Sequence, residues 1–442
     1  MRSSAASDVY KRQVRYYVEL LETQLEKTTF LSNLPIPSAH LQALTRVSLS
    51  HADEAGVRLA RFFAHHLLDA GAFDHALEMA EAGIDQRDHG EAADQDLILA
   101  ELYYLKGAVL LRRRKEKESR VWFEKSLAIR QPLLGKPHKD TAAVLEQLAI
   151  VDNFLGDVAS AKYHSQQLVE IYEQWDPPNK KGLGNVRYGL GVLHFLQGEL
   201  DEALEQSARS FANRKEALPD NSPYLAHTLN LLAAICYNRG EYDRALGYQL
   251  DCWERQRAAL GDDNPLTLSA FGNLGHTESA IGRVEAAENK LHLALEKARQ
   301  VFPPQHPGLS FILTAIGGHY CRVGQYGKSE SYLVEGKAIV ANGNPRTSPL
   351  MELLLSLAKV YVAQGNFTEA KDALDQFKGL EEQAFPATHF RVGYRLWVEG
   401  DLATAEGDRP AGQVFYKKAL AVFEQAGLSQ HPEVLRLTAL ID

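Results

Sequence analysis

The chain has 442 residues, of which 45% are hydrophobic and 24% are charged, and its formal net charge is −9. This composition excludes a disordered or membrane-embedded chain, and the acidic balance disfavours a nucleic-acid partner, because nucleic-acid-binding surfaces are usually basic. No apolar stretch is long enough to span a bilayer. The three cysteines, Cys236, Cys252 and Cys321, are too few for a disulfide framework, which fits a cytoplasmic location.

The N-terminal segment stands apart from the rest of the chain. Residues 1–13 match no repeat and lack the apolar core of a secretory signal, so we expect a non-native or disordered leader. Residues 14–56 are expected to form a leading helix, from Val14 to Leu31, followed by a connection that contains Pro35 and Pro37. The helix carries about two heptads, so a short coiled coil stays open as an alternative.

A recurring glycine organises residues 57–426. The glycines of this column are Gly71, Gly156, Gly198, Gly240, Gly282, Gly324, Gly365 and Gly407. From Gly156 onward the intervals between them are constant, apart from one that is shorter by a single residue. The interval between Gly71 and Gly156 is twice as long and leaves room for one more repeat, in which Arg114 takes the place of glycine. The spacing therefore predicts nine repeats.

Two further columns of small residues keep the same register. Every residue seven positions before the glycine column is Gly or Ala, and every residue five positions after it is Ala, Ser or Gly. Small residues at these places let two antiparallel helices approach closely, and the column glycine ends the first helix in a left-handed turn. No strand pattern appears, so the predicted fold class is all-α, a stack of helix-turn-helix units.

Prolines mark where the first helices begin. Pro223, Pro265, Pro307 and Pro349 recur at the interval of the glycine column and follow Ser222, Asn264, His306 and Ser348. The residue before each proline is predicted to cap the helix and the proline to be its first residue, although histidine is a weaker cap than serine or asparagine. Residues 427–442 are expected to form a C-terminal capping helix over the apolar edge of repeat nine.

The glycine and small-residue columns resemble tetratricopeptide repeats, and the 42-residue unit resembles the kinesin light chain type. The segment HTLNLLAAICYNRGEYDRAL, from His227 to Leu246, carries the resemblance best. The resemblance implies a right-handed superhelical α-solenoid of about nine antiparallel helix-turn-helix repeats whose first helices line a concave face. Arg114 in repeat two, and Glu399 and Gly412 in repeat nine, depart from the pattern.

The family analogy also suggests a peptide groove on the concave face, formed by four groove columns that lie ten, six, three and two residues before the glycine column. Its candidate residues are Tyr188, Asn230, Tyr237 and Asn238. An asparagine side chain can bond both the N–H and the C=O of an extended peptide, and tyrosine offers apolar area with a polar tip. Packing between neighbouring repeats is the alternative role for the same side chains.

These features predict a non-catalytic interaction scaffold that binds a protein or peptide. No nucleophile, acid–base pair or metal-ligand spacing appears, and no cofactor is expected. Neither a nucleic acid nor a membrane is expected as a partner. The alternative is a sensory or regulatory module that controls an output domain, such as a protein kinase or transcription regulator, absent from this chain. The partner's identity and the oligomeric state stay open.

Overall fold

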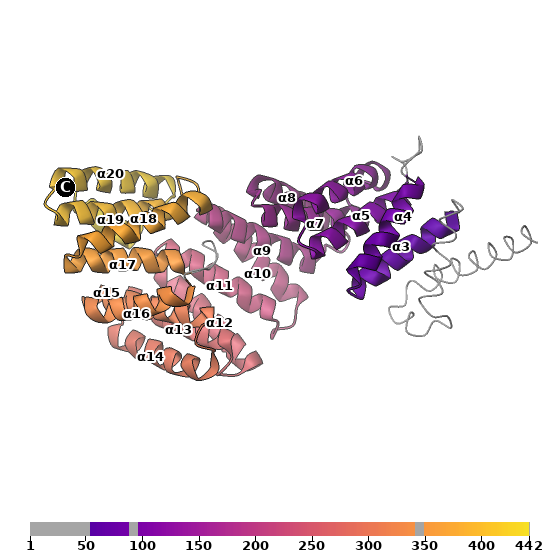
Figure 1. The fold of residues 1–442 in the computed structure, drawn as a ribbon. Coiled ribbons are helices and arrows are strands. Elements are labelled where there is room, and N and C mark those ends of the chain that lie inside the picture. Colours follow the sequence, from indigo (N-terminus) through magenta and orange to yellow (C-terminus); the bar gives the residue numbers. More distant parts are fainter. Residues whose placement is uncertain (1–53, 88–95, 341–348, 442) are drawn as a thin grey trace, which may run out of the picture. The chain divides into compact units, whose positions relative to one another are not determined.

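The computed structural model describes residues 54–87, 96–340 and 349–441, and all regular structure in these ranges is helical (Figure 1). The first helices of the repeats are α3 (Glu54–Asp69), α5 (Leu97–Arg112), α7 (Lys139–Leu155), α9 (Lys180–Gln197), α11 (Pro223–Asn238), α13 (Pro265–Ala280), α15 (Pro307–Arg322), α17 (Leu350–Gln364) and α19 (Phe390–Ala405). The second helices are α4 (Phe73–Arg87), α6 (Glu116–Leu134), α8 (Val158–Gln174), α10 (Leu200–Ala217), α12 (Tyr242–Leu260), α14 (Val284–Val301), α16 (Tyr326–Val340), α18 (Phe367–Ala384) and α20 (Arg409–Gln425).

These helices form nine hairpins, followed by the short helix α21 (Pro432–Thr438). The predicted all-α array of nine helix-turn-helix repeats is therefore confirmed. The expected leader and the helix from Val14 to Leu31 lie outside the described residues. The chain divides into two compact units, Met1–Asn179 and Lys180–Asp442, with the described hairpins α3–α8 in the first and α9–α21 in the second.

A left-handed residue ends the first helix of every repeat. All eight glycines of the column have φ between 74° and 97°, and Arg114 occupies the same conformation with φ of 59°. Arg114 is the one non-glycine residue with positive φ within the described ranges. The turn geometry thus imposes a left-handed backbone even where the sequence provides a side chain that disfavours it.

Close contact between the two helices of a hairpin explains the small-residue columns. A Cβ atom placed on Gly317 would lie 2.5 Å from the Leu333 side chain, and one on Gly275 would lie 2.8 Å from Leu291. The hydroxyl of Ser329 donates a hydrogen bond of 2.7 Å to the carbonyl of Gly317 across the same contact. Small residues are therefore required where the backbones meet.

Histidine caps more of these helices than we expected. The Nδ1 atoms of His138, His306, His389 and His431 each accept a hydrogen bond from the backbone N–H two residues later. Asn264 caps α13 as predicted, with 3.0 Å between its Oδ1 and the Leu266 nitrogen. Pro349 differs from the prediction, because it precedes α17 instead of being its first residue.

Within the unit Lys180–Asp442, the array closes on itself. The α9–α10 hairpin shares an apolar cluster with α19, α20 and α21, about half of the sequence away. The ring centroids of Phe195 and Phe390 are 6.4 Å apart, and His389 lies against Gly198. One apolar cluster spans this contact and contains Leu200, Phe390, Tyr416, Ala419, Phe423, Leu428, Val434 and Leu437. Six hairpins and α21 therefore form a closed ring.

Candidate binding site

Side chains from three repeats meet on the inner face of this ring. Arg322, the last residue of α15, donates a hydrogen bond of 2.7 Å from Nη2 to the hydroxyl of Tyr237 on α11. The ring of Tyr237 lies 4.9 Å, centroid to centroid, from that of His276 on α13. The curvature of the array thus brings together residues that lie two repeats apart in the sequence.

The C-terminal repeats complete this group. The hydroxyl of Tyr394 on α19 is 3.5 Å from Nε2 of His431, which caps α21. Tyr242, at the start of α12, lies between His431 and Tyr237, with ring centroids 6.0 Å and 5.3 Å away. We call Tyr237, Tyr242, His276, Arg322, Tyr394 and His431 the inner cluster.

Most side chains of the inner cluster are only partly buried, so they contact both protein and water. Arg322 is exposed, and Tyr237 and His276 are half-buried. Burial nevertheless raises the pKa of Tyr237 to about 12 and lowers the pKa of His276 to about 3. Burial also acts to lower the pKa of Arg322, but Tyr237, Glu433 and Tyr242 outweigh it and raise that pKa. These side chains therefore reach water at one side and are desolvated by protein at the other.

Charged residues surround the inner cluster without pairing to it. Glu352 on α17 and Glu433 on α21 both act on the charge of Arg322, yet neither of these described residues is within ion-pairing distance of it. Arg391 on α19 is half-buried, and burial lowers its pKa, an effect that Glu352 partly offsets. The inner face therefore offers both cationic and anionic groups to an occupant.

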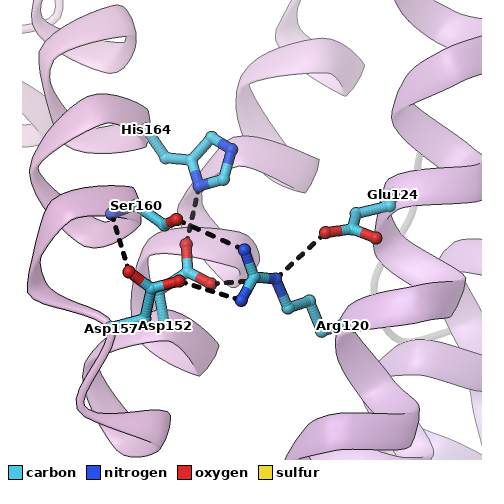
Figure 2. A network of polar contacts seen from close by, with 6 residues as sticks. All are labelled: Arg120, Glu124, Asp152, Asp157, Ser160 and His164. Carbon is cyan, nitrogen blue, oxygen red and sulfur yellow. Dashed lines mark hydrogen bonds and ion pairs between the residues drawn. The ribbon is translucent and has the colours of Figure 1, made fainter.

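A second polar network lies in the other unit and connects α6, α7 and α8 (Figure 2). Asp152 on α7 is fully buried, 3.3 Å from Nε of Arg120 and 2.7 Å from Nδ1 of His164. Arg120 also pairs with Asp157 at 3.0 Å and bonds Ser160 at 3.3 Å. Because Arg120 and His164, from α6 and α8, share the buried carboxylate of Asp152 on α7, this network holds neighbouring repeats together.

The described residues offer neither a metal site nor a membrane-spanning helix. No group of three or more His, Cys, Asp or Glu side chains in residues 54–87, 96–340 and 349–441 is placed to hold a metal ion. In the same ranges, no helix combines the length and apolarity that a membrane crossing requires.

The repeats match a known family model. The model described as "Tetratricopeptide repeat" matches residues 98–174, 182–252 and 224–300, and a second model of the same description matches 351–376; together they cover half of the chain. The chain belongs to the tetratricopeptide repeat (TPR) family.

A plant relative and solved structures resemble this TPR chain. "Protein KINESIN LIGHT CHAIN-RELATED 2" of Arabidopsis thaliana is 22% identical over 271 residues, covering 60% of this chain and 38% of that protein, so the chain spans less than half of this relative. The quorum sensor NprR of B. thuringiensis, in its apo form, is 14% identical over 86% of this chain and 99% of its own, with a TM-score of 0.58. A Rap protein complexed with Competence and Sporulation Factor is 13% identical over 84% and 98%, with a TM-score of 0.52. These two likenesses show the fold alone.

The four residues expected in a peptide groove differ in their surroundings. Tyr237 belongs to the inner cluster, whereas Tyr188 packs under the guanidinium of Arg214, 4.6 Å from its ring centroid. Asn238 donates to the carbonyl of Ala234 on its own helix at 2.8 Å. Asn230 is exposed and accepts a hydrogen bond of 3.3 Å from Asn273 of the next TPR. A groove centred on all four stays a prediction.

His276 stands in a groove column, six residues before Gly282, but sequence reasoning missed Arg322, Tyr394 and His431, for two reasons. Arg322 lies two residues before Gly324, the same column that holds Asn238, so extending the groove columns to repeat seven finds it. Tyr394 and His431 carry no such signal, because they reach Tyr237 and Tyr242 only through closure of the ring.

Proposed function

We propose that this TPR protein is an interaction scaffold that binds a segment of a partner protein, or a peptide, on the inner face of the ring formed by Lys180–Asp442. One observation carries the proposal. The inner cluster collects tyrosine, histidine and arginine from four repeats and α21 on a surface that is concave and still reaches water. Binding sites are commonly concave, with a few convergent polar groups whose pKa values are shifted.

An extended polypeptide suits this surface better than a compact partner. A concave face can surround a narrow chain, while a globular domain contacts mainly the rim. The tyrosines provide apolar area with a hydroxyl at the tip, and the exposed Asn230 provides an amide for a peptide backbone. The proposed binding residues are Asn230, Tyr237 and Asn238 on α11 and Tyr188 on α9.

Affinity capture with the complete chain as bait tests this proposal. Partner proteins recovered by the wild type are expected to be lost with Tyr237→Ala and reduced with the double variant Asn230→Ala, Asn238→Ala. Tyr163→Ala serves as a matched control, because Tyr163 is 63% exposed on α8, in the other unit. Undiminished recovery by both inner-face variants, with unchanged helicity by circular dichroism, would remove the proposal.

A sensory or regulatory module is the second candidate. The observation that favours it is the likeness, with a TM-score of 0.58, to NprR, which is described as a quorum sensor. In this alternative, the bound peptide would change the shape of the chain and so control an output domain outside it. Small-angle scattering with and without a captured peptide separates the two: a scaffold keeps its radius of gyration, and a sensor changes it.

We also propose that the protein is not an enzyme, uses no cofactor and acts in the cytoplasm. The absence of catalytic and metal-ligand motifs from the sequence supports the first two points. The third rests on the three free cysteines, of which Cys236 and Cys252 are buried.

A further inference from the structure

We propose that the ring opens at one place, where α19, α20 and α21 meet the turns of the α9–α10 and α11–α12 hairpins, and that this gate admits the partner segment. The inference rests on the proposed function and adds the route by which a ligand reaches the inner cluster. We call this contact the closing joint. Its residues are Phe195, Gly198, Leu200, Gly240, His389, Phe390, His431 and Pro432.

No chain connection crosses the closing joint. Successive hairpins of the ring are linked by short connections, such as residues 218–222 between α10 and α11 and residues 385–389 between α18 and α19. The joint instead brings Gly198 against His389, about half of the sequence away. Opening it therefore breaks only non-covalent contacts and leaves each hairpin packed on its sequence neighbours.

Few apolar side chains hold the closing joint. The α9–α10 hairpin contributes Phe195 and Leu200 to the cluster there, and the other buried members, from Phe390 to Leu437, belong to α19, α20, α21 and their connections. By contrast, the cluster that joins α17 to its neighbours takes buried side chains along that helix from Leu350 to Val360. Because most of the cluster at the joint stays packed on the C-terminal side, separating the two sides exposes little apolar surface.

A histidine occupies the centre of each contact across the joint. His389 is 1% exposed, and its ring hydrogen-bonds the backbone of Phe195 while Nδ1 accepts from the N–H of Arg391. His431, which is 2% exposed, lies against Gly240 and caps α21. When the two sides separate, the imidazole of His389 and the Phe195 backbone can bond water, which offsets part of the lost contact.

The α18–α19 junction is suited to act as the hinge. A buried ion pair fixes this junction, because Nε of Arg395 on α19 is 2.8 Å from the carboxylate of Glu381 on α18 and the two side chains are 10% and 4% exposed. The α19–α20 hairpin and α21 share one apolar cluster, so they can move as one body. A rotation at this junction would separate the two sides of the joint without unpacking α19 from α18.

The closing joint divides the inner cluster. Tyr237 and Tyr242 lie on the α11–α12 side, whereas Tyr394 and His431 lie on the C-terminal side, and the ring centroids of Tyr242 and His431 are 6.0 Å apart. A ligand on the inner cluster would therefore contact both sides and favour the closed ring. Opening of the joint admits the ligand, and binding then retains it.

The native thiol of Cys321 reports access to the inner face. It stands three residues before Gly324, in the groove column of Tyr237. Cys321 is half-buried, whereas Cys236 and Cys252 are fully buried. The full chain is treated with iodoacetamide, or with a maleimide joined by a short linker to a folded protein, and peptide mapping by mass spectrometry locates the label. Only the bulky maleimide requires an open ring.

The variant Gly198→Ala acts as a wedge, because the added Cβ would lie 3.0 Å from the His389 ring and 3.3 Å from its Cα. It should raise the rate at which the bulky maleimide labels Cys321 by about tenfold and change the iodoacetamide rate little. Gly282→Ala is the matched control, since Gly282 is also left-handed, with φ of 82°, but no described neighbour lies within 4 Å of a Cβ added there. Equal labelling of wild type and Gly198→Ala by the bulky maleimide would overturn the gate.

Two further measurements distinguish opening of the joint from unfolding. Labelling of Cys236 and Cys252 in step with Cys321 would mean that the whole unit unfolds, and the gate would then be rejected. If Gly198→Ala does not fold, Leu200→Ala takes its place, because it removes an apolar side chain from the joint and leaves the turn unchanged. This variant should also accelerate the bulky maleimide, and an unchanged rate would contradict the inference.

The labelling needs no partner, so it separates the gate from the proposed function. The role of the gate in binding is tested with the partner protein recovered by affinity capture. Its association rate, measured by surface plasmon resonance, should rise about tenfold with Gly198→Ala and stay unchanged with Gly282→Ala, since entry waits for opening. An association rate that the wedge does not change would remove the gate and leave the proposed function standing. If no partner is recovered, the proposed function fails, and the labelling still decides whether the ring opens.

Discussion

Gly240 lies directly against His431, and a Cβ atom added at Gly240 would stand 2.9 Å from the imidazole and 2.5 Å from Pro432. The same relationship occurs one repeat earlier, where a Cβ on Gly198 would stand 3.0 Å from His389. In both pairs, the glycine ends a first helix and the histidine caps a helix near the C-terminal end, at the same separation along the sequence. The ring is thus closed by two equivalent contacts in the register of the repeat.

Gly240→Ala should destabilise the ring more than Gly282→Ala does. Both glycines are left-handed, with φ of 76° and 82°, so both variants carry about 1 kcal/mol of backbone cost. Only Gly240 has neighbours within 4 Å, and displacing His431 and Pro432 should add about 1–3 kcal/mol. Urea unfolding of the two variants measures the difference. Equal midpoints would mean that the glycine–histidine contact contributes nothing.

Acid should weaken the ring through His389. Burial lowers its pKa to about 3, whereas an unfolded histidine titrates near 6.5. Below pH 6.5 the unfolded chain therefore binds more protons, so stability falls as pH falls, by at most about 1.4 kcal/mol per pH unit for this group. Arg391 is the charged neighbour that acts in the same direction.

The variant His389→Asn tests whether protonation of His389 causes the loss of stability in acid. Asparagine keeps an acceptor for the N–H of Arg391 and does not titrate, so the variant should lose less stability than the wild type between pH 6.5 and about 4. The slope against pH is the readout, since loss of stacking on Phe385 lowers stability at every pH. Parallel curves for wild type and His389→Asn would contradict the expectation.

Arg114→Gly should stabilise the chain. Its φ of 59° places a side chain where glycine is favoured, at a cost of about 1 kcal/mol. Part of that gain is offset because the guanidinium lies 5.4 Å from the ring centroid of Phe154. We expect a net gain of about 0.5 kcal/mol in chemical denaturation. Arg113→Gly, at a neighbouring residue with φ of −87°, should destabilise instead.

Asp152→Ala should be severely destabilising. The variant removes the fully buried carboxylate that Arg120 and His164 share, and loss of one partner from a buried ion pair costs about 3–5 kcal/mol. Glu124→Ala removes an exposed partner of the same arginine and should cost less than about 1 kcal/mol. Thermal unfolding followed by circular dichroism compares them. Similar midpoints would show that the buried network does not hold the repeats together.

Local features of the fold could be read from the sequence, because each turn and each small-residue contact depends on residues within one repeat. Spacing alone assigned Arg114 to a left-handed turn, and the structure confirms it. Closure of the ring could not be found this way. Gly240 and Gly282 occupy the same column and look alike in sequence, and only the distant His431 distinguishes them.

The candidate site was only partly predictable for the same reason. The groove columns identified Tyr237, because its position within its own repeat determines the helix face on which its side chain lies. They could not find Tyr394 or His431, which approach from the far end of the unit. The four histidine caps were undervalued because histidine accepts at Nδ1 only when the ring is neutral and carries its proton on Nε2. Burial lowers the pKa of His389 and His431 and so favours the neutral ring.

The shared burial of Leu200 with Val434 and Leu437 has a consequence for biosynthesis. An open array can complete each hairpin as it emerges from the ribosome, since each repeat needs only its neighbours. Here Leu200 in the fourth repeat cannot be buried against Val434 and Leu437 until most of the remaining chain has been translated. During that interval the nascent chain exposes the apolar surface around Leu200, and we expect a holding chaperone to bind there.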